Sequence, residues 1–273
     1  AYWSFDSSTG TLTISGSGAM NDYEYGNDYP WMDYRDSIQT IVIGDQITQI
    51  GRYAFTGTAC STIKFGKNVR SIGERAFLEC RNLNGDLTLP DSVQIVGNNA
   101  FSECTGLTGT LTLGSSLQTI GAGAFYDCSF SGNLVIPDSV KSIGSSAFSG
   151  CSGLTSITIP DSVTSIGESA FSGCSGLTSM TIPFVGNRAG VTANDTYQYP
   201  FGYIFGTSSY TGGTGTQQCY YGSSTSSTTS GYYYIPSSLK CVTVTGGNIL
   251  CGAFMDCSGL TSVTIPDSVT RIG

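Results

Sequence analysis

Short runs of alternating hydrophobic and polar residues recur along this chain at intervals of about two dozen residues. Triplets such as Leu87-Thr88-Leu89 and Ile157-Thr158-Ile159 have the period of two that is typical of a half-buried β-strand. We expect nine such strands, one in each repeat, which begin at Ile41, Ile63, Leu87, Leu111, Leu134, Ile157, Met180, Val242 and Val263. Because all of them run in the same direction, the pattern predicts one parallel sheet of about nine strands.

An Ala-Phe pair marks the next part of each repeat. The Phe residues of these pairs are separated by 22, 24, 24, 23, 23 and 83 residues: Phe55, Phe77, Phe101, Phe125, Phe148, Phe171 and Phe254. An aliphatic residue stands five positions before each Phe, and Gly follows it in every copy but the last, where Leu250 stands. Cys stands three positions after the Phe in every copy but the first. The segment from Glu168 to Gly173 is expected to be a short helical turn.

Self-similarity at this period predicts a right-handed repeat solenoid of the leucine-rich-repeat type, mainly β with short helical turns. Residues 1–37 lack the repeat, and apolar runs at 3–5 and 12–14 flank a turn, which predicts an N-terminal cap with a β-hairpin. The chain divides into this cap (1–37), leucine-rich repeats (38–183), an insertion (184–238) and further repeats (239–273) that stop within a copy. We expect an uncovered last coil that associates with other molecules or frays.

The insertion is rich in Tyr, Gly, Ser and Thr. Tyr set among Ser and Gly is typical of adaptable binding surfaces, because its ring offers rigid amphipathic area at low entropic cost. The alternative is that the rings pack on each other and on the flank of the solenoid. The candidate binding residues are Tyr197, Tyr199, Tyr203, Tyr210, Tyr220, Tyr221, Tyr232 and Tyr233. The stretch 223–230 is expected to be mobile.

The outward positions of the expected strands are mostly Thr and carry little charge. Thr158, Thr181 and Thr243 are candidates for a flat, hydroxyl-rich stripe that contacts an extended protein or glycan. The alternative is that Thr is a good β-former tolerated on an exposed sheet, and for the stripe taken alone we prefer this alternative.

Composition and charge argue against several classes of function. Of the 273 residues only 11% are charged and the net charge is −8, which argues against nucleic acid and anionic membranes as partners. No apolar run approaches the ~20 residues that span a bilayer, so no membrane insertion is expected. The chain has no His, which removes His-activated nucleophiles and His-ligated metals, and Asp195 is the only acid in the insertion. We therefore expect a protein that is not an enzyme and binds no cofactor or metal.

Two residue sets remain as candidates for other chemistry. Six of the ten Cys recur at one repeat position and are expected to be buried thiols, whereas Cys219, Cys241 and Cys251 are better candidates for a disulfide. Acids of the cap lie among aromatic residues, and we interpret them as a solvated rim in preference to a calcium site: Asp22, Glu24, Asp28, Asp33 and Asp36.

The repeat also carries a family likeness. Its pattern, I-x-I-P-x-S-V-x-x-I-G-x-x-A-F-x-x-C-x-x-L from Ile157 to Leu177, resembles the BspA-type leucine-rich repeat family of bacterial surface proteins. The N-terminal segment WSFDSSTGTLTISGSGAM is similar to the module that precedes such arrays. The resemblance implies a secreted or cell-surface bacterial protein that binds host or matrix proteins, or neighbouring cells, without known catalytic residues.

These observations together predict a non-catalytic extracellular module for recognition or adhesion, which binds a host or matrix protein or a glycan through the solenoid face and the Tyr-rich insertion. A structural spacer that presents other domains of a larger surface protein is the alternative. A carbohydrate-active enzyme is the third, less favoured, interpretation.

Overall fold

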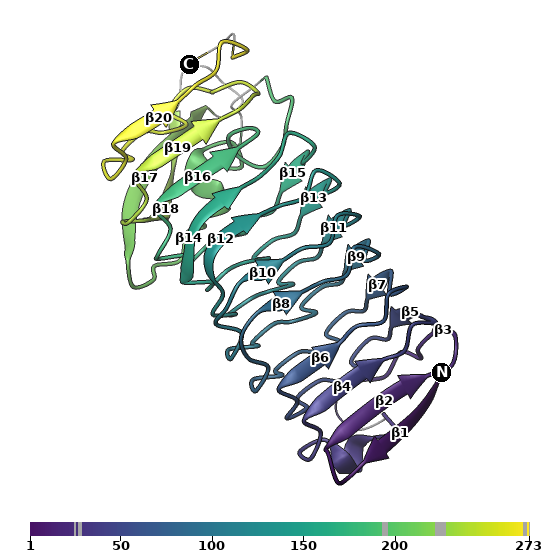
Figure 1. Ribbon diagram of the computed structural model, residues 1–273. Helices are drawn as coiled ribbons and strands as arrows, with labels where there is room; N and C mark the ends of the chain where they lie inside the picture. The colour runs from purple at the N-terminus through teal and green to yellow at the C-terminus, as the bar shows by residue number, and fades with distance from the viewer. Residues whose placement is uncertain (25, 27–28, 193–195, 222–227, 270–271, 273) are drawn as a thin grey trace.

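The computed structural model describes residues 1–24, 26, 29–192, 196–221, 228–269 and 272, and shows a stack of coils that rises from the N-terminus to the C-terminus (Figure 1). The first six coils each contribute one strand to each of two flanks and a series of turns to a third side. The predicted solenoid is confirmed. Among the described residues no helix is long and apolar enough to cross a membrane.

All nine strands expected from the alternating pattern are present on the first flank: β4 (Thr40–Ile43), β6 (Thr62–Lys64), β8 (Leu87–Thr88), β10 (Leu111–Thr112), β12 (Ser131–Val135), β14 (Gly153–Thr158), β16 (Ser179–Ile182), β19 (Cys241–Val244) and β20 (Ser262–Thr264). They do not form one continuous sheet, however. Hydrogen bonding divides them into three parallel groups, β4-β6, β8-β10 and β12-β14-β16-β19-β20. Strand β20 is the edge of the last group, and association of molecules through it stays a prediction.

The divisions follow from the lengths of the repeats. The first residue of the expected strand stands 8 positions after the preceding Phe in the first case (Ile63), 10 in the next two (Leu87, Leu111) and 9 in the three that follow (Leu134, Ile157, Met180). Both divisions, between β6 and β8 and between β10 and β12, fall where this spacing changes. An added or missing residue displaces the backbone donors from their acceptors on the neighbouring coil, so the ladder is interrupted there.

A second sheet forms on the other flank of the solenoid. It has seven strands in sequence order: β3 (Gly18–Ala19), β5 (Ile47–Ile50), β7 (Ser71–Ile72), β9 (Ile95–Val96), β11 (Thr119–Ile120), β13 (Ser142–Ile143) and β15 (Ser165–Ile166). From β5 onward the last residue of each strand is the aliphatic residue five positions before the Phe, and its side chain is buried.

The Ala-Phe segments form a third ladder between coils, and the expected helical turns are wrong. At Phe77 the flanking Arg75 and Glu79 have φ values of 54° and 58°, in the left-handed region. This alternation directs the N–H groups of Arg75, Phe77 and Glu79 to carbonyl oxygens of the next coil, at 2.9, 2.8 and 2.8 Å. In a helical turn these donors would remain within their own coil. Each coil therefore needs acceptors on the coil that follows it.

The Phe rings stack along the interior of the solenoid. Neighbouring ring centroids from Phe55 to Phe171 lie between 5.0 and 5.7 Å apart, and the rings are fully buried. The recurring Cys has a specific partner: Cys104 Sγ donates to the carbonyl oxygen of Phe77 in the preceding coil at 3.1 Å, and the Cys residues from Cys80 to Cys174 repeat this contact. A small apolar side chain with one weak donor fits this position.

The Gly of each repeat is required because neighbouring coils approach closely. A Cβ atom at Gly121 would lie 2.7 Å from the backbone nitrogen of Asn98 and 2.6 Å from the carbonyl carbon of Gly97. The same conflict with the preceding backbone recurs at each equivalent Gly: Gly51, Gly73, Gly97, Gly144 and Gly167. In the last copy Leu250 stands at this position, and its side chain is buried.

Replacing Gly121 by Ala is therefore expected to lower the free energy of unfolding by about 1 to 3 kcal/mol, because two rigid backbones must separate to admit the methyl group. Urea unfolding followed by circular dichroism measures the loss. Ser116→Ala, at an exposed position of the same repeat, is the control and should change the free energy by less than about 0.5 kcal/mol. Equal stability of the two variants would contradict the close approach.

The predicted cap is present at the N-terminus. Strands β1 (Tyr2–Asp6) and β2 (Thr11–Ser15) form an antiparallel hairpin, and β2 pairs with β4 in parallel. The short 3-10 helix η1 (Met32–Tyr34) follows Trp31, whose ring stacks on Phe55 at 5.4 Å. The Trp31 Nε1–H donates to the carbonyl oxygen of Ala54 at 3.0 Å. In later coils the equivalent Ala carbonyl oxygen accepts the N–H of the Phe of the preceding coil.

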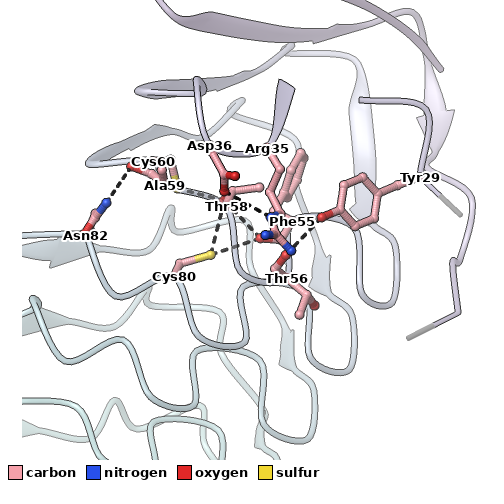
Figure 2. Close-up of polar contacts among 10 residues, drawn as sticks. All are labelled: Tyr29, Arg35, Asp36, Phe55, Thr56, Thr58, Ala59, Cys60, Cys80 and Asn82. Atoms are coloured by element: carbon pink, nitrogen blue, oxygen red, sulfur yellow. Dashed lines mark hydrogen bonds and ion pairs between the residues drawn. The ribbon is translucent and has the colours of Figure 1, made fainter. Parts of the chain in front are cut away.

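The first coil has Thr58 at the repeat position where later coils have Cys. Figure 2 shows Thr58 there, with its hydroxyl 3.0 Å from the carbonyl oxygen of its own Phe55 and 3.4 Å from Cys80 Sγ. Tyr29 on the cap donates its hydroxyl to the carbonyl oxygen of Thr56 at 3.2 Å. Cap and first coil are thus joined by both ring stacking and hydrogen bonds.

Candidate binding surface

The first part of the insertion covers the end of the second sheet. The Ile166 N–H donates to the carbonyl oxygen of Asn187 at 2.7 Å, and the Ala189 N–H donates to that of Thr164 at 3.0 Å. Arg188 forms an antiparallel bridge with Ser165. The chain therefore crosses the open edge of β15 in the reverse direction, which ends the seven-stranded sheet.

The middle of the insertion replaces an Ala-Phe turn. The 3-10 helix η2 (Phe201–Ile204) supplies the carbonyl oxygen of Ile204 to the N–H of Phe171 at 2.9 Å, as the Ala of a following repeat would. The Phe201 N–H donates in turn to the carbonyl oxygen of Ala253 at 2.9 Å. The rings of Phe201 and Phe205 are fully buried, and the Phe201 centroid lies 4.9 Å from that of Phe254. The insertion thus completes the seventh coil, a role that sequence reasoning missed.

The end of the insertion is a long hairpin of β17 (Gly213–Tyr221) and β18 (Thr228–Pro236), beside the last coils in Figure 1. Its inner face is buried and carries Thr216, Tyr233, Ile235 and Gln218. Gln218 Oε1 accepts the N–H of Gly202 at 2.6 Å, and its Nε2 donates to Cys257 Sγ at 2.9 Å. One amide side chain therefore joins the hairpin to η2 and to the eighth coil.

Several candidate tyrosines belong to this packing and contribute little open surface. Tyr199, Tyr203 and Tyr233 are buried, and the Tyr233 hydroxyl donates to the carbonyl oxygen of Tyr197 at 2.7 Å. Tyr210 is half-buried, and its hydroxyl donates to the carbonyl oxygen of Tyr234 at 2.9 Å. Burial raises the pKa of Tyr210 and Tyr233. These four rings therefore follow the alternative interpretation, in which the tyrosines pack within the protein.

The remaining candidates differ in exposure. Tyr220 is half-buried, Tyr197 is 44% exposed and Tyr232 is 54% exposed. The side chain of Tyr221 and the stretch 222–227, where mobility was expected, lie outside the described residues; Thr228–Ser230 belong to β18.

The outer face of the hairpin groups exposed polar and aromatic side chains. The ring of Tyr232 lies 5.5 Å from that of Tyr234 and crosses the backbone of Gly215, where a Cβ would meet the ring. Gln217 Nε2 donates to Ser230 Oγ at 2.7 Å on the same face. We call Tyr232, Tyr234, Gln217 and Ser230 the outer hairpin face. A strand pair fixed on its inner side holds these groups in place.

The three candidate threonines of the strands form a continuous row. Thr158 on β14 is the direct neighbour of Thr181 on β16, which in turn is the neighbour of Thr243 on β19. Thr158 is exposed and the other two are half-buried. The structure thus brings these three residues together, whereas the tyrosines are distributed over both faces of the hairpin and the loops around it.

The described residues offer little support for a metal site or a disulfide. No group of three or more Cys, Asp or Glu among the described residues is placed to hold a metal ion. In the cap, Glu24 forms an ion pair with Arg52 at 2.7 Å, and Asp22 accepts the N–H of Arg52 at 2.7 Å. Asp28 and Asp195 lie outside the described residues. Within the described part of the chain Cys219 and Cys241 are free thiols, so neither of these two candidates forms a disulfide there.

Burial of the repeated thiols makes stability depend on pH. It raises the pKa of Cys80, Cys104 and Cys151 well above the ordinary value of 9.0, and that of Cys174 to about 12. Above pH 9 the unfolded chain releases protons that the folded chain keeps, so the free energy of unfolding is expected to fall as pH rises from about 9 towards 12. Urea unfolding at pH 8 and pH 10 measures this. Constant stability over that interval would contradict buried neutral thiols.

Comparison with known proteins agrees with this architecture. Residues 32–131, 84–193 and 216–273 match the family model for the BspA type leucine-rich repeat region, in six copies. No curated protein gives a significant match. A solved leucine-rich repeat protein of T. pallidum is 26% identical over 66% of this chain and 78% of its own, with a TM-score of 0.51.

Two further solved structures are more distant. A leucine-rich repeat protein of Bacteroides ovatus ATCC 8483 is 22% identical, covering 100% of this chain and 76% of its own, with a TM-score of 0.44. A leucine rich cell surface protein of Faecalibacterium prausnitzii A2-165 is 19% identical, covering 97% and 93%, with a TM-score of 0.37. The family segments include well over half of the sequence and contain the strands, Phe residues and thiols that build the coils. The chain therefore belongs to the BspA-type leucine-rich repeat family.

Proposed function

We propose that this protein is a non-catalytic recognition module that acts outside the bacterial cell or on its surface, and that it binds a host or matrix protein, or a glycan, through the outer hairpin face and the threonine row. The observation that carries the proposal is the outer hairpin face itself. It exposes Tyr232 beside Gln217 and Ser230, and the buried Gln218 and Tyr233 on the opposite side fix it to the solenoid.

Such a face suits recognition because a fixed aromatic ring loses little conformational entropy on binding, and neighbouring amide and hydroxyl groups supply directed hydrogen bonds. The row of Thr158, Thr181 and Thr243 adds an uncharged flat strip, which suits an extended partner. Membership of a repeat family supports a role based on surface contacts, since solenoids distribute binding over extended faces.

Binding of intact protein and variants to a panel of matrix proteins and glycans tests this. The double substitution Tyr232→Ala with Gln217→Ala is expected to weaken binding to a partner by about tenfold or more, and Thr181→Lys to weaken it as well. Tyr126→Ala is the matched control, because Tyr126 is 41% exposed on another coil. If the parent binds no partner in the panel, or all variants bind as the parent does, the proposal is wrong and the spacer interpretation is favoured.

A further inference from the structure

A hollow of about 250 Å³ lies in the N-terminal cap, at the opposite end of the solenoid from the hairpin. Its lining includes Tyr2, Trp3, Tyr23, Trp31 and Asn21. The rings of Trp3 and Tyr23 stand edge-on to that of Trp31, with centroids 6.2 and 5.6 Å from it. Four aromatic rings from three segments of the cap therefore converge on one cavity.

The cap does not need all of these rings for folding. The terminal unit of a solenoid usually presents a polar outer face, because its task is to separate the core from water. Trp31 performs that task here, since it is buried against Phe55. Tyr2 and Trp3 on the outer strand β1 remain 77% and 38% exposed. Clustered exposed aromatic area of this kind marks a binding site more often than a folding requirement.

The lining defines the chemistry of the ligand. Among the described residues, no acidic or basic side chain lines the hollow. Of the acids nearby, Asp22 and Glu24 are both held by Arg52, as described above. A cation would meet ring faces but no carboxylate among the described lining residues, and an anion would meet no basic side chain.

A sugar ring has complementary properties. Its C–H face is apolar and packs on aromatic rings, while its hydroxyl groups need amide and hydroxyl partners, which Asn21 and the tyrosines offer at this site. Pockets for drug-sized ligands span about 300 to 1,000 Å³, so a hollow of about 250 Å³ suits one ring of a longer chain. We infer that the cap contains a second binding site, which takes a single neutral sugar ring of a glycan and is separate from the outer hairpin face.

Intrinsic fluorescence tests the inference directly, because the two tryptophans of the chain, Trp3 and Trp31, both line this hollow. The intact protein is titrated with chitotetraose, cellotetraose and mannotetraose, and with a sialylated and a sulfated oligosaccharide as charged comparisons. At least one neutral probe should give a saturable change in tryptophan emission, and the charged probes should not bind more tightly. Calorimetry gives the affinity independently of fluorescence.

Variants then locate the site. Tyr2→Ala and Trp3→Ala should each weaken binding by about tenfold or more, whereas Tyr126→Ala should bind as the parent does. Tyr2 is mostly exposed, so its variant keeps the test valid even if Trp3→Ala destabilises the cap. The inference is overturned if no neutral probe binds, if only charged probes bind, or if folded Tyr2→Ala binds unchanged. Because the outer hairpin variants leave this site intact, failure here is distinct from failure of the proposed function.

Discussion

Replacing Phe201 by Ala is expected to lower the free energy of unfolding by about 3 to 5 kcal/mol, which is as much as the loss of a Phe from a regular repeat. Phe201 lies in an insertion that resembles a surface loop in sequence, yet its ring is fully buried against Phe254 and Phe205. Truncation leaves a cavity between the seventh coil and the eighth. Urea unfolding followed by far-ultraviolet circular dichroism measures the loss.

Tyr197→Ala is the control for this prediction, since Tyr197 lies in the same insertion and is 44% exposed. Part of its ring packs near Tyr203, so a small loss is expected, well below that of Phe201→Ala. If Phe201→Ala cost no more than about 0.5 kcal/mol, as ordinary surface substitutions do, the insertion would not be part of the core.

Phe148→Ala is expected to have a similar effect, about 3 to 5 kcal/mol, because the cavity would open between Phe125 and Phe171, at 5.3 and 5.7 Å from the Phe148 ring. A repeat solenoid transmits stability through contacts between neighbouring coils, so a break in the middle uncouples the two halves. We therefore expect the variant to unfold over a broader range of urea concentration than the parent.

The control for Phe148→Ala is Ser145→Ala, at an exposed position three residues earlier in the same coil. It should leave both the midpoint and the steepness of the transition unchanged. A loss below about 1 kcal/mol for Phe148→Ala would show that its ring is not a core element.

Sequence patterns predicted the strands, the Phe interior and the cap because each depends on local periodicity. The strand triplet Ile157-Thr158-Ile159 buries both isoleucines and exposes the threonine, as period-two alternation requires. The Ala-Phe turn was predicted as helical because small residues and Gly173 suggest a helix end. Its actual form depends on acceptors about 23 residues away in the next coil, which no local pattern records.

The structure of the insertion was harder to predict from the sequence, again because it depends on contacts between residues that are far apart in the chain. Its residues replace coil elements without the repeat pattern: the Ile204 carbonyl takes the acceptor role of Ala, the Phe201 N–H takes the donor role of Phe, and Gln218 is a buried amide among Tyr, Gly and Thr. Composition alone does not show which tyrosines face inward, since Tyr232 is exposed and the adjacent Tyr233 is buried. One signal was available: Leu250 stands where all other copies have Gly, the residue that the close approach of neighbouring coils requires.

Hydrogen exchange of single backbone amides tests the central claim, that the insertion completes the stack, most directly. The N–H groups of Phe171 and Phe201 donate to Ile204 and Ala253 in the same way that the N–H of Phe101 donates to Ala124. We predict that all three exchange slowly and with comparable protection. Protection of Phe101 together with rapid exchange of Phe171 and Phe201 would contradict the claim, since the insertion would then be a loop attached beside an interrupted solenoid.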